Sequence, residues 1–261
     1  MIKFSSVSPI VTNNRTLQGS LIVSSDAGKI FKIDKFGNEI ANSIPSGVFS
    51  PVNPPPDGLA LDPSDNSLWV STENNSSGTS SDIRVWNIDF VTGSPISSFG
   101  VNEFDPTATD IEGICVDPWD FTLWLISDGL TSFNLYHLQR NGNLIQTYDL
   151  STKGLSSPQD LCIDPVLQRI IITDNNLNSI FFFDLNMNFI NSVLMDKLDP
   201  VPVSLQGIAY DPTNGFYWVT YYLPEDWIVL IDREGRPLHK FPNSNYTISP
   251  SANPTGIAVG W

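Results

Sequence analysis

The sequence predicts an all-β fold: a single five-bladed β-propeller over residues 18–261, preceded by an N-terminal arm over residues 1–17. Two observations carry this prediction, a short phrase that recurs at regular intervals and an incomplete copy of it at the C-terminus. The phrase reads DGLALDP at 57–63, EGICVDP at 112–118, QDLCIDP at 159–165, QGIAYDP at 206–212 and TGIAV at 255–259. Successive copies begin 55, 47, 47 and 49 residues apart, and one four-stranded propeller blade takes about 40 to 50 residues.

The first blade lacks the phrase. Its first two strands are expected around a turn at Asp26, and a second turn at Gly37 leads to a third strand. The C-terminal copy is expected to supply the missing innermost strand, so that the last strand closes the ring and leaves no open sheet edge at the seam. The five blades are therefore predicted at 20–44 with 254–261, 57–99, 112–150, 159–196 and 206–242.

In each later blade the phrase forms the innermost strand and ends in Asp-Pro. This pair favours a turn, because Asp caps the turn and Pro cannot continue a strand. The second strand carries large apolar residues at matching positions, which indicates a core between neighbouring sheets. We therefore interpret the Asp-Pro aspartates as turn residues without a catalytic role: Asp62, Asp117, Asp164 and Asp211.

The net charge of the chain limits the kinds of molecule that it can bind. The chain carries 13 Lys and Arg against 28 Asp and Glu, a formal net charge of −15. Such a surface repels nucleic acid and anionic membranes, whereas metal cations and basic protein surfaces are compatible with it. The sequence shows neither an apolar run of 18 residues nor an export signal, which predicts a protein of the cytoplasm or of an assembled particle, without membrane insertion.

Several kinds of chemistry are not expected. Cys115 and Cys162 hold the same position in consecutive copies, so we predict free, buried thiols. His137 and His239 fall in a third and an outer strand, away from the channel, so we do not expect a Ser-His-Asp hydrolase. Motifs for a nucleophile elbow, a zinc protease or a phosphate-binding loop are absent, and we expect no nucleotide, haem or zinc.

Polar residues are predicted to gather at one end of the channel. The connections between blades and the loops between strands two and three share one face of a propeller, here called the top. The first residues of the phrases should line the channel mouth on this face, and Asp160 replaces the Gly of its copy: Asp57, Glu112, Gln159, Asp160, Gln206 and Thr255. Surrounding loops should add Asp26, Glu73, Asp128, Asp174 and Tyr222 as candidate binding residues.

This acidic mouth is a candidate cation site. Clustered carboxylates raise one another's pKa unless a cation neutralises them, and oxygen ligands without His or Cys favour Ca²⁺ or Mg²⁺. The candidate ligands are Asp57, Glu112, Asp110 and Asn175. The alternative is an acidic, solvated rim around a wet channel.

The blade cores, DGLALDP with LWVS at 68–71 and EGICVDP with LWL at 123–125, resemble those of NHL-repeat and gluconolactonase-like propellers. The resemblance covers all five blades and implies the propeller architecture. Gluconolactonase-like enzymes hold a divalent cation with a Glu and an Asp at inner-strand mouths and with Asn ligands, which implies roles for Glu112, Asp57 and Asn175. Such repeats nevertheless serve enzymes, scaffolds and receptors alike.

Two functions remain open. The one we favour is a non-catalytic propeller that binds protein or carbohydrate through its loop face, as a structural component of a larger assembly such as a virion or tail. The arm would then contact a neighbouring chain through Phe4, Val7, Ile10 and Val11. The alternative is a Ca²⁺-dependent hydrolase of the lactonase or esterase type with its metal at the channel mouth. We assign no catalytic residue.

Overall fold

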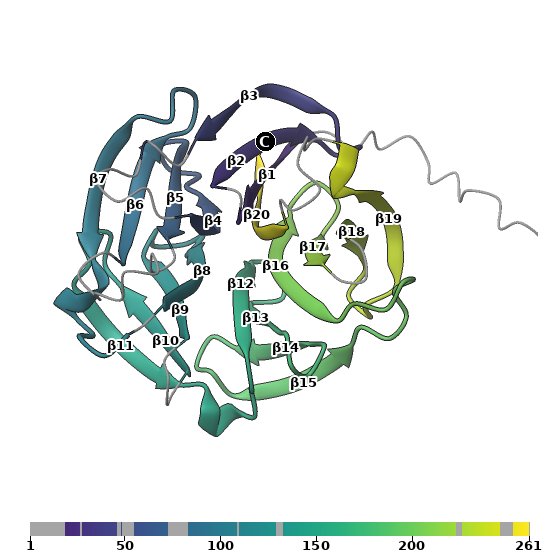
Figure 1. The fold of residues 1–261 in the computed structure, drawn as a ribbon. Helices are drawn as coiled ribbons and strands as arrows, with labels where there is room; N and C mark the ends of the chain where they lie inside the picture. Colours follow the sequence, from purple (N-terminus) through teal and green to yellow (C-terminus); the bar gives the residue numbers. More distant parts are fainter. Residues whose placement is uncertain are drawn as a thin grey trace, which may run out of the picture.

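The computed structural model describes residues 19–26, 28–45, 48, 55–72, 83–108, 110–128, 133–222, 226–245 and 253–260. These residues form five four-stranded antiparallel sheets in a ring around a central axis (Figure 1). The predicted five-bladed propeller is therefore confirmed. Within the described ranges, no helix has the length and apolar character needed to span a bilayer.

The first blade joins the two ends of the described chain. Its strand order is β20-β1-β2-β3, with β20 (Pro254–Gly260) innermost, followed by β1 (Ser20–Ser25), β2 (Lys29–Asp34) and β3 (Glu39–Pro45). β20 pairs antiparallel with β1, with Ser20 opposite Gly260 and Val23 opposite Ile257. The C-terminal copy of the phrase thus closes the ring as predicted. It supplies the innermost strand that the first blade otherwise lacks.

The other four blades follow the chain from the axis outward. The second blade contains β4 (Pro56–Leu61), β5 (Ser67–Thr72), β6 (Arg84–Asp89) and β7 (Pro95–Gly100), and the third contains β8 (Asp110–Val116), β9 (Leu123–Asp128), β10 (Phe133–Leu138) and β11 (Leu144–Asp149). The fourth contains β12 (Pro158–Asp164), β13 (Arg169–Asp174), β14 (Ser179–Asp184) and β15 (Phe189–Leu194). The fifth contains β16 (Ser204–Asp211), β17 (Phe216–Tyr222), β18 (Trp227–Ile231) and β19 (Pro237–Pro242). Short 3-10 helices lie in three of the top connections: η3 (Val101–Glu103), η4 (Ser151–Lys153) and η5 (Asn243–Asn245).

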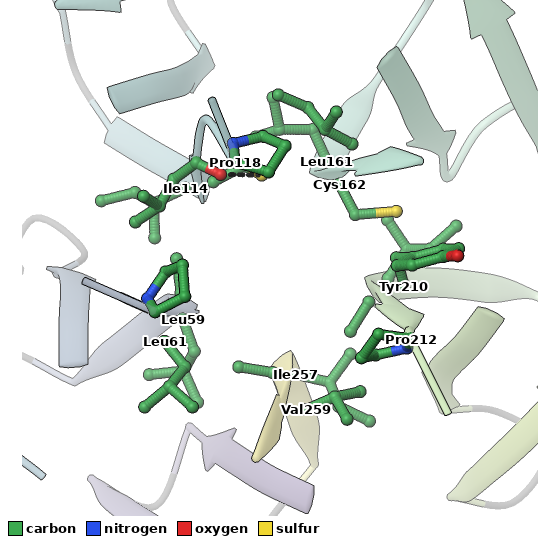
Figure 2. Close-up of a pocket in the computed structure, with 18 of the residues that line it drawn as sticks. Leu59, Leu61, Ile114, Pro118, Leu161, Cys162, Tyr210, Pro212, Ile257 and Val259 are labelled. Carbon is green, nitrogen blue, oxygen red and sulfur yellow. Dashed lines mark hydrogen bonds between the residues drawn. The ribbon is translucent and has the colours of Figure 1, made fainter. Parts of the chain in front are cut away.

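The core lies between neighbouring blades, as the matching apolar positions of the second strands predict. Trp69 and Trp218, which hold equivalent positions in β5 and β17, are 1% and 0% exposed. One cluster joins Ile171 and Phe182 of the fourth blade to Tyr217 and Val219 of the fifth. The apolar side chains of the five inner strands surround a space on the axis (Figure 2).

The Asp-Pro turns connect the first strand of a blade to the second. Asp62 accepts hydrogen bonds from the backbone N–H of Ser64 (2.9 Å) and from the indole N–H of Trp69 (3.1 Å). Asp117 and Asp211 make the same two kinds of contact, the latter with Trp218 at 3.0 Å. The turn role is therefore observed, and each carboxylate also fixes the buried indole seven residues later.

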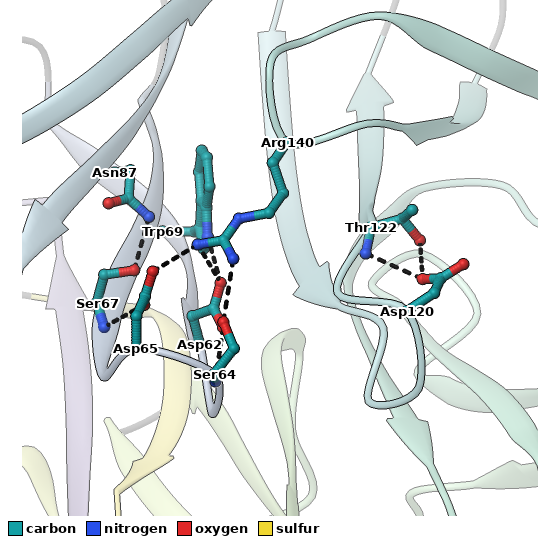
Figure 3. Close-up of polar contacts among 9 residues, drawn as sticks. All are labelled: Asp62, Ser64, Asp65, Ser67, Trp69, Asn87, Asp120, Thr122 and Arg140. Atoms are coloured by element: carbon teal, nitrogen blue, oxygen red, sulfur yellow. Dashed lines mark hydrogen bonds and ion pairs between the residues drawn. The ribbon is translucent and has the colours of Figure 1, made fainter.

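Three of these aspartates also pair with a cation from the next blade. Arg140, in the β10–β11 turn, contacts the carboxylate of Asp62 at 2.8 Å and that of Asp65 at 2.7 Å (Figure 3). Lys35 pairs with Asp211 at 2.6 Å, and Arg233 pairs with Asp164 at 3.3 Å. The cation lies one or two residues after the end of a third strand in all three cases, so a repeating ion pair links adjacent blades at the bottom.

Of the four junctions with an Asp-Pro aspartate, one carries an apolar residue at the cation position. The β14–β15 turn closes with a hydrogen bond from Asp184 N to Asn188 O, as the β2–β3 turn does from Asp34 N to Asn38 O. Leu185 therefore occupies the position that Lys35 holds in the first blade, facing the blade that contains Asp117. The bottom ion pair is thus replaced at this junction by apolar packing of Leu185 against the core.

Leu185→Arg should add the missing ion pair. We expect it to raise the free energy of unfolding by about 0.5 to 1 kcal/mol, because Asp117 already has a buried carboxylate at this junction. Urea unfolding of Leu185→Arg and of Leu185→Met, which keeps an apolar side chain, measures the contribution of the charge. Equal stability of the two variants would show that the guanidinium does not reach Asp117.

Candidate functional site

The inner strands bring the predicted mouth residues together at the top of the channel. A small hollow is lined by Asp57, Glu112, Gln159, Asp160, Gln206, Gly207, Thr255 and Gly256. The strands begin one or two residues before the phrase, at Pro56, Asp110, Pro158, Ser204 and Pro254. The hollow has ≈ 0 Å³ of space for a water-sized sphere, so the mouth is closed and not a wet channel.

Close approach of the five strands closes this mouth. The register of four inner strands shifts at the first two residues of the phrase, which form a β-bulge against the second strand. A β-carbon at Gly58 would lie 2.7 Å from the Glu112 carbonyl oxygen, and one at Gly207 would lie 2.5 Å from that of Thr255. The repeated Gly of the phrase is therefore required because the next strand occupies the space of a side chain.

Hydroxyl groups of the second strands join the bulges of neighbouring blades. Thr220 accepts the N–H of Gly207 in its own blade at 2.8 Å and donates to the carbonyl of Thr255 in the next at 2.9 Å. Three further hydroxyls make the equivalent pair of bonds: Ser24 with Gly256 and Asp57, Ser71 with Gly58 and Glu112, and Thr173 with Asp160 and Gln206. These four hydroxyls tie four of the five blade junctions at the axis.

The fifth junction uses Asp160 instead. The third blade has Ile126, which lacks a hydroxyl, at the corresponding position of its second strand. This position is identified by the preceding residue, Leu125, which pairs with Ile114. The neighbouring copy carries Asp160 where the others carry Gly, and its carboxylate accepts the N–H of Leu161 at 2.8 Å and that of Ile208 at 3.0 Å. The N–H of Ile114 also hydrogen-bonds to it. One buried carboxylate therefore contacts backbone of the third, fourth and fifth blades.

Burial dominates the electrostatics of Asp160. Its side chain is 3% exposed, and this desolvation raises the pKa of Asp160 well above its usual value, although the backbone N–H donors offset part of the effect. The sequence analysis placed Asp160 among the residues that line the channel mouth, and it does line the hollow. The structure also gives it the geometry of a cross-blade connector.

The other predicted residues are spread over the top face. Asp174 is buried and accepts the backbone N–H groups of Ser156 and Ser157, and Asp26 accepts the backbone and side-chain N–H groups of Asn253. Tyr222 is half-buried at the end of β17. Asp110 and Asn175 are not among the residues that line the hollow. Glu73, the side chain of Asp128 and the arm residues Phe4, Val7, Ile10 and Val11 lie outside the described residues.

The candidate cation ligands do not form a compact set. Asp57 and Glu112 share the hollow, and Asp57 is 5% exposed. Among the described residues, no group of three or more His, Cys, Asp or Glu side chains has the geometry to hold a metal ion. The mouth as described therefore offers two of the four candidate ligands, with Asp160 as a third carboxylate, in a closed space.

The bottom end of the channel contains a cavity that the sequence analysis missed. An apolar chamber of ≈ 150 Å³ lies on the axis below the bulges, and its nineteen described lining residues are all uncharged (Figure 2). They are the apolar residues of the five phrases, and the prolines of the four Asp-Pro turns complete the wall. The sequence carries a signal for this wall, because three apolar or aromatic residues follow the first two positions of every copy, but a run of such residues does not show whether five strands leave a space between them.

Both cysteines line this chamber. They are free thiols as predicted, although only Cys162 is buried and Cys115 is partly exposed. Burial raises the pKa of both thiols, and the nearby carboxylate of Asp160 acts in the same direction. The thiols are therefore protonated, poorly nucleophilic members of an apolar wall.

The two histidines pack as structural side chains. His137 stacks on Trp124, with ring centroids 4.1 Å apart, and one ring nitrogen lies 2.7 Å from the hydroxyl of Thr122. His239 contacts Trp218 and Phe241 edge-on or tilted. Burial lowers the pKa of both imidazoles. Neither residue lines the mouth or the chamber.

Comparison with solved structures supports the architecture. The chain is similar to a structure titled nidogen/laminin complex (14% identity, 94% of this chain and 99% of the other, TM-score 0.57) and to a luciferin-regenerating enzyme (15%, 95% and 83%, 0.54). It is also similar to a glutaminyl cyclase from Myxococcus xanthus (14%, 78% and 80%, 0.55). The expected resemblance to known propellers is thus confirmed for the fold. No protein-family model matches the sequence, and no curated protein matches it.

Proposed function

We propose that this protein is a non-catalytic propeller that binds a protein partner through its top loop face. The observation that carries the proposal is a group of exposed aliphatic side chains on the top of the fourth blade and on its connection to the fifth. This top patch consists of Leu177, Leu194, Val201 and Val203, which are 40%, 51%, 47% and 64% exposed. Apolar groups that gather on one surface are typical of protein interaction sites.

The top patch is held on a rigid base. Beneath it, Met195 and Leu198 are buried, and Met195 N donates to Asn178 O at 2.9 Å, which ties the end of β15 to the β13–β14 turn. The hydroxyl of Tyr221 donates to Pro200 O at 3.3 Å, which anchors the connection between the blades. A preorganised patch loses little conformational entropy on binding, which favours a specific partner.

The chemistry around the patch favours a particular partner. Two carboxylates, Asp196 and Asp199, and one ammonium group, Lys197, are exposed beside it, and the whole chain has a formal net charge of −15. A complementary surface would present apolar side chains surrounded by Lys and Arg. Aliphatic groups suit a protein better than a carbohydrate, whose hydroxyl groups need polar partners. The similar solved structures include both enzymes and a protein complex, so the fold is compatible with this role.

The proposal is tested by charge substitution in the top patch. We expect Val203→Glu to weaken binding to the physiological partner at least about tenfold, because a carboxylate would be buried in an apolar interface. Val91→Glu is the matched control, since Val91 is 81% exposed on a bottom turn. Wild type, Val203→Glu and Val91→Glu are each immobilised and incubated with extract of the source cells. Quantitative mass spectrometry then compares the proteins that each one retains. The affinity of the purified partner is then measured.

Two results would contradict the proposal. One is a partner that binds Val203→Glu and wild type equally, and the other is a partner lost only from Val91→Glu. Unchanged thermal unfolding of both variants is required before either comparison is read. A glycan array with wild-type protein tests the carbohydrate alternative directly.

Calcium binding at the mouth, the basis of the hydrolase alternative, has its own test. If Asp57 and Glu112 hold Ca²⁺, titration calorimetry should show saturable heat that Asp57→Asn removes, since the substitution takes away one negative ligand. The control is Asp65→Asn, a half-exposed carboxylate at the bottom. Absence of heat with wild-type protein would exclude a Ca²⁺-dependent activity at this position.

A further inference from the structure

The axial chamber has the properties of a ligand site, independently of the top patch. It is a blind-ended space: the bulges close its top, where the hollow admits no water-sized sphere, and the Asp-Pro turns surround its lower end. Its walls come from all five inner strands, so the chamber is held by the most buried part of each blade. A cavity built in this way keeps its shape without a ligand.

The size and lining of the chamber define what fits. Its volume of ≈ 150 Å³ matches that of an enclosed apolar cavity that binds benzene, and this chamber is open at the bottom face. Leu59, Ile114, Leu161 and Ile257 lie around the central space (Figure 2). The hydroxyl of Tyr210 points away from this space (Figure 2). An occupant therefore meets a largely hydrocarbon wall and no charged partner.

Charge excludes other ligand classes. An anion in the chamber would lose its hydration against an uncharged wall. It would also lie near the carboxylates of the four Asp-Pro turns, in a chain of net charge −15. Three of these carboxylates are already neutralised by Lys35, Arg140 and Arg233. A cation would lose its hydration without gaining a ligand from the wall. An uncharged hydrophobic molecule gains burial at no such cost.

We propose that the axial chamber binds a small, uncharged, ring-sized hydrophobic molecule that enters from the bottom face. The occupant is a free molecule of the benzene or toluene class. Its binding buries apolar surface on both partners in a preformed cavity, so no rearrangement of the blades is required.

The two cysteines provide the readout, because they are the only cysteines of the chain and both line the chamber. Full-length protein is treated with methyl methanethiosulfonate, a small neutral thiol reagent, and modification is followed by intact mass. We expect toluene at ten times its dissociation constant to slow modification roughly tenfold and to raise the unfolding temperature. Sodium benzoate at the same concentration should do neither. Cys115→Ser and Cys162→Ser variants assign each modification.

A chamber-filling substitution provides the second measurement. Ala258→Leu places a larger side chain on the wall and should abolish toluene protection while the protein remains folded by circular dichroism. If that variant does not fold, the comparison of toluene with benzoate in wild-type protein still decides. The proposal is wrong if toluene at saturation neither protects the cysteines nor raises the unfolding temperature. Equal protection by benzoate also overturns it.

Discussion

Lys35→Met is expected to lower the free energy of unfolding by about 3 to 5 kcal/mol, because it leaves the buried carboxylate of Asp211 without its cation. Both side chains of this pair are 0% exposed, with 2.6 Å between the ammonium nitrogen and the carboxylate oxygen. The pair joins the first blade to the fifth, next to the seam that β20 closes. Guanidinium unfolding followed by tryptophan fluorescence measures the loss.

The same pair predicts a pH dependence. Burial acts to raise the pKa of Asp211, but the hydrogen bonds from Lys35, Thr213 and Trp218 outweigh it and the net pKa lies below the usual value. A carboxyl whose pKa is lowered by folding contributes stability above its unfolded pKa of about 3.9 and loses it as the pH falls through the folded pKa. Lys35→Met should therefore remove part of the acid sensitivity of wild-type protein.

Two variants control for side-chain loss alone. Arg140→Met removes an equivalent cation whose side chain is 38% exposed, so its effect should be smaller. Lys35→Met combined with Asp211→Asn removes both charges and should recover much of the stability lost by the single variant. A double variant no more stable than Lys35→Met would mean that the unpaired charge is not the cause.

Asp160→Gly is expected to cost about 2 to 3 kcal/mol. The substitution removes the acceptor for the buried N–H groups of Leu161 and Ile208 and leaves them unsatisfied. Urea unfolding measures this loss. Because burial raises the pKa of Asp160, its carboxyl contributes stability below its unfolded pKa and loses it as the pH rises through the folded value. The variant should therefore show a weaker fall of stability than wild type as the pH rises above the unfolded Asp pKa of about 3.9.

A second substitution should rescue this variant. Asp160→Gly with Ile126→Thr gives this junction the same residues as the other four. A hydroxyl at 126 can accept the N–H of Gly113 in its own blade and donate to the carbonyl of Gln159 in the next, as Thr220 does with Gly207 and Thr255. We expect the double variant to recover at least half of the lost stability, whereas Ile126→Thr alone should destabilise by placing a hydroxyl in an apolar site. A double-mutant cycle measures this coupling. Additive effects would refute the assignment of Asp160 as the substitute for the missing hydroxyl.

The sequence by itself determined the blades, the closure by β20 and the Asp-Pro turns. These features depend on local chemistry that repeats: the Asp-Pro pair ends the inner strand in the four copies that carry it. Asp62 caps its turn by accepting the N–H of Ser64, and consecutive apolar residues bury both faces of the inner strand. Closure was predictable as well, because a first blade without the phrase and a last phrase without a blade complete each other.

Only the tertiary structure decided what happens on the axis and between the blades. Thr220 bonds to Thr255 across 35 residues, Lys35 reaches Asp211 across 176, and Ser24 meets Gly256 across 232. Nothing in one repeat shows which side chain of the next will face it. The same limit explains why the sequence predicted Asp160 at the mouth but not its contacts with three blades, and why it did not predict the chamber. The end of a channel is open or closed according to the distance between the backbones of the five inner strands. This distance depends on how the five blades pack in the ring.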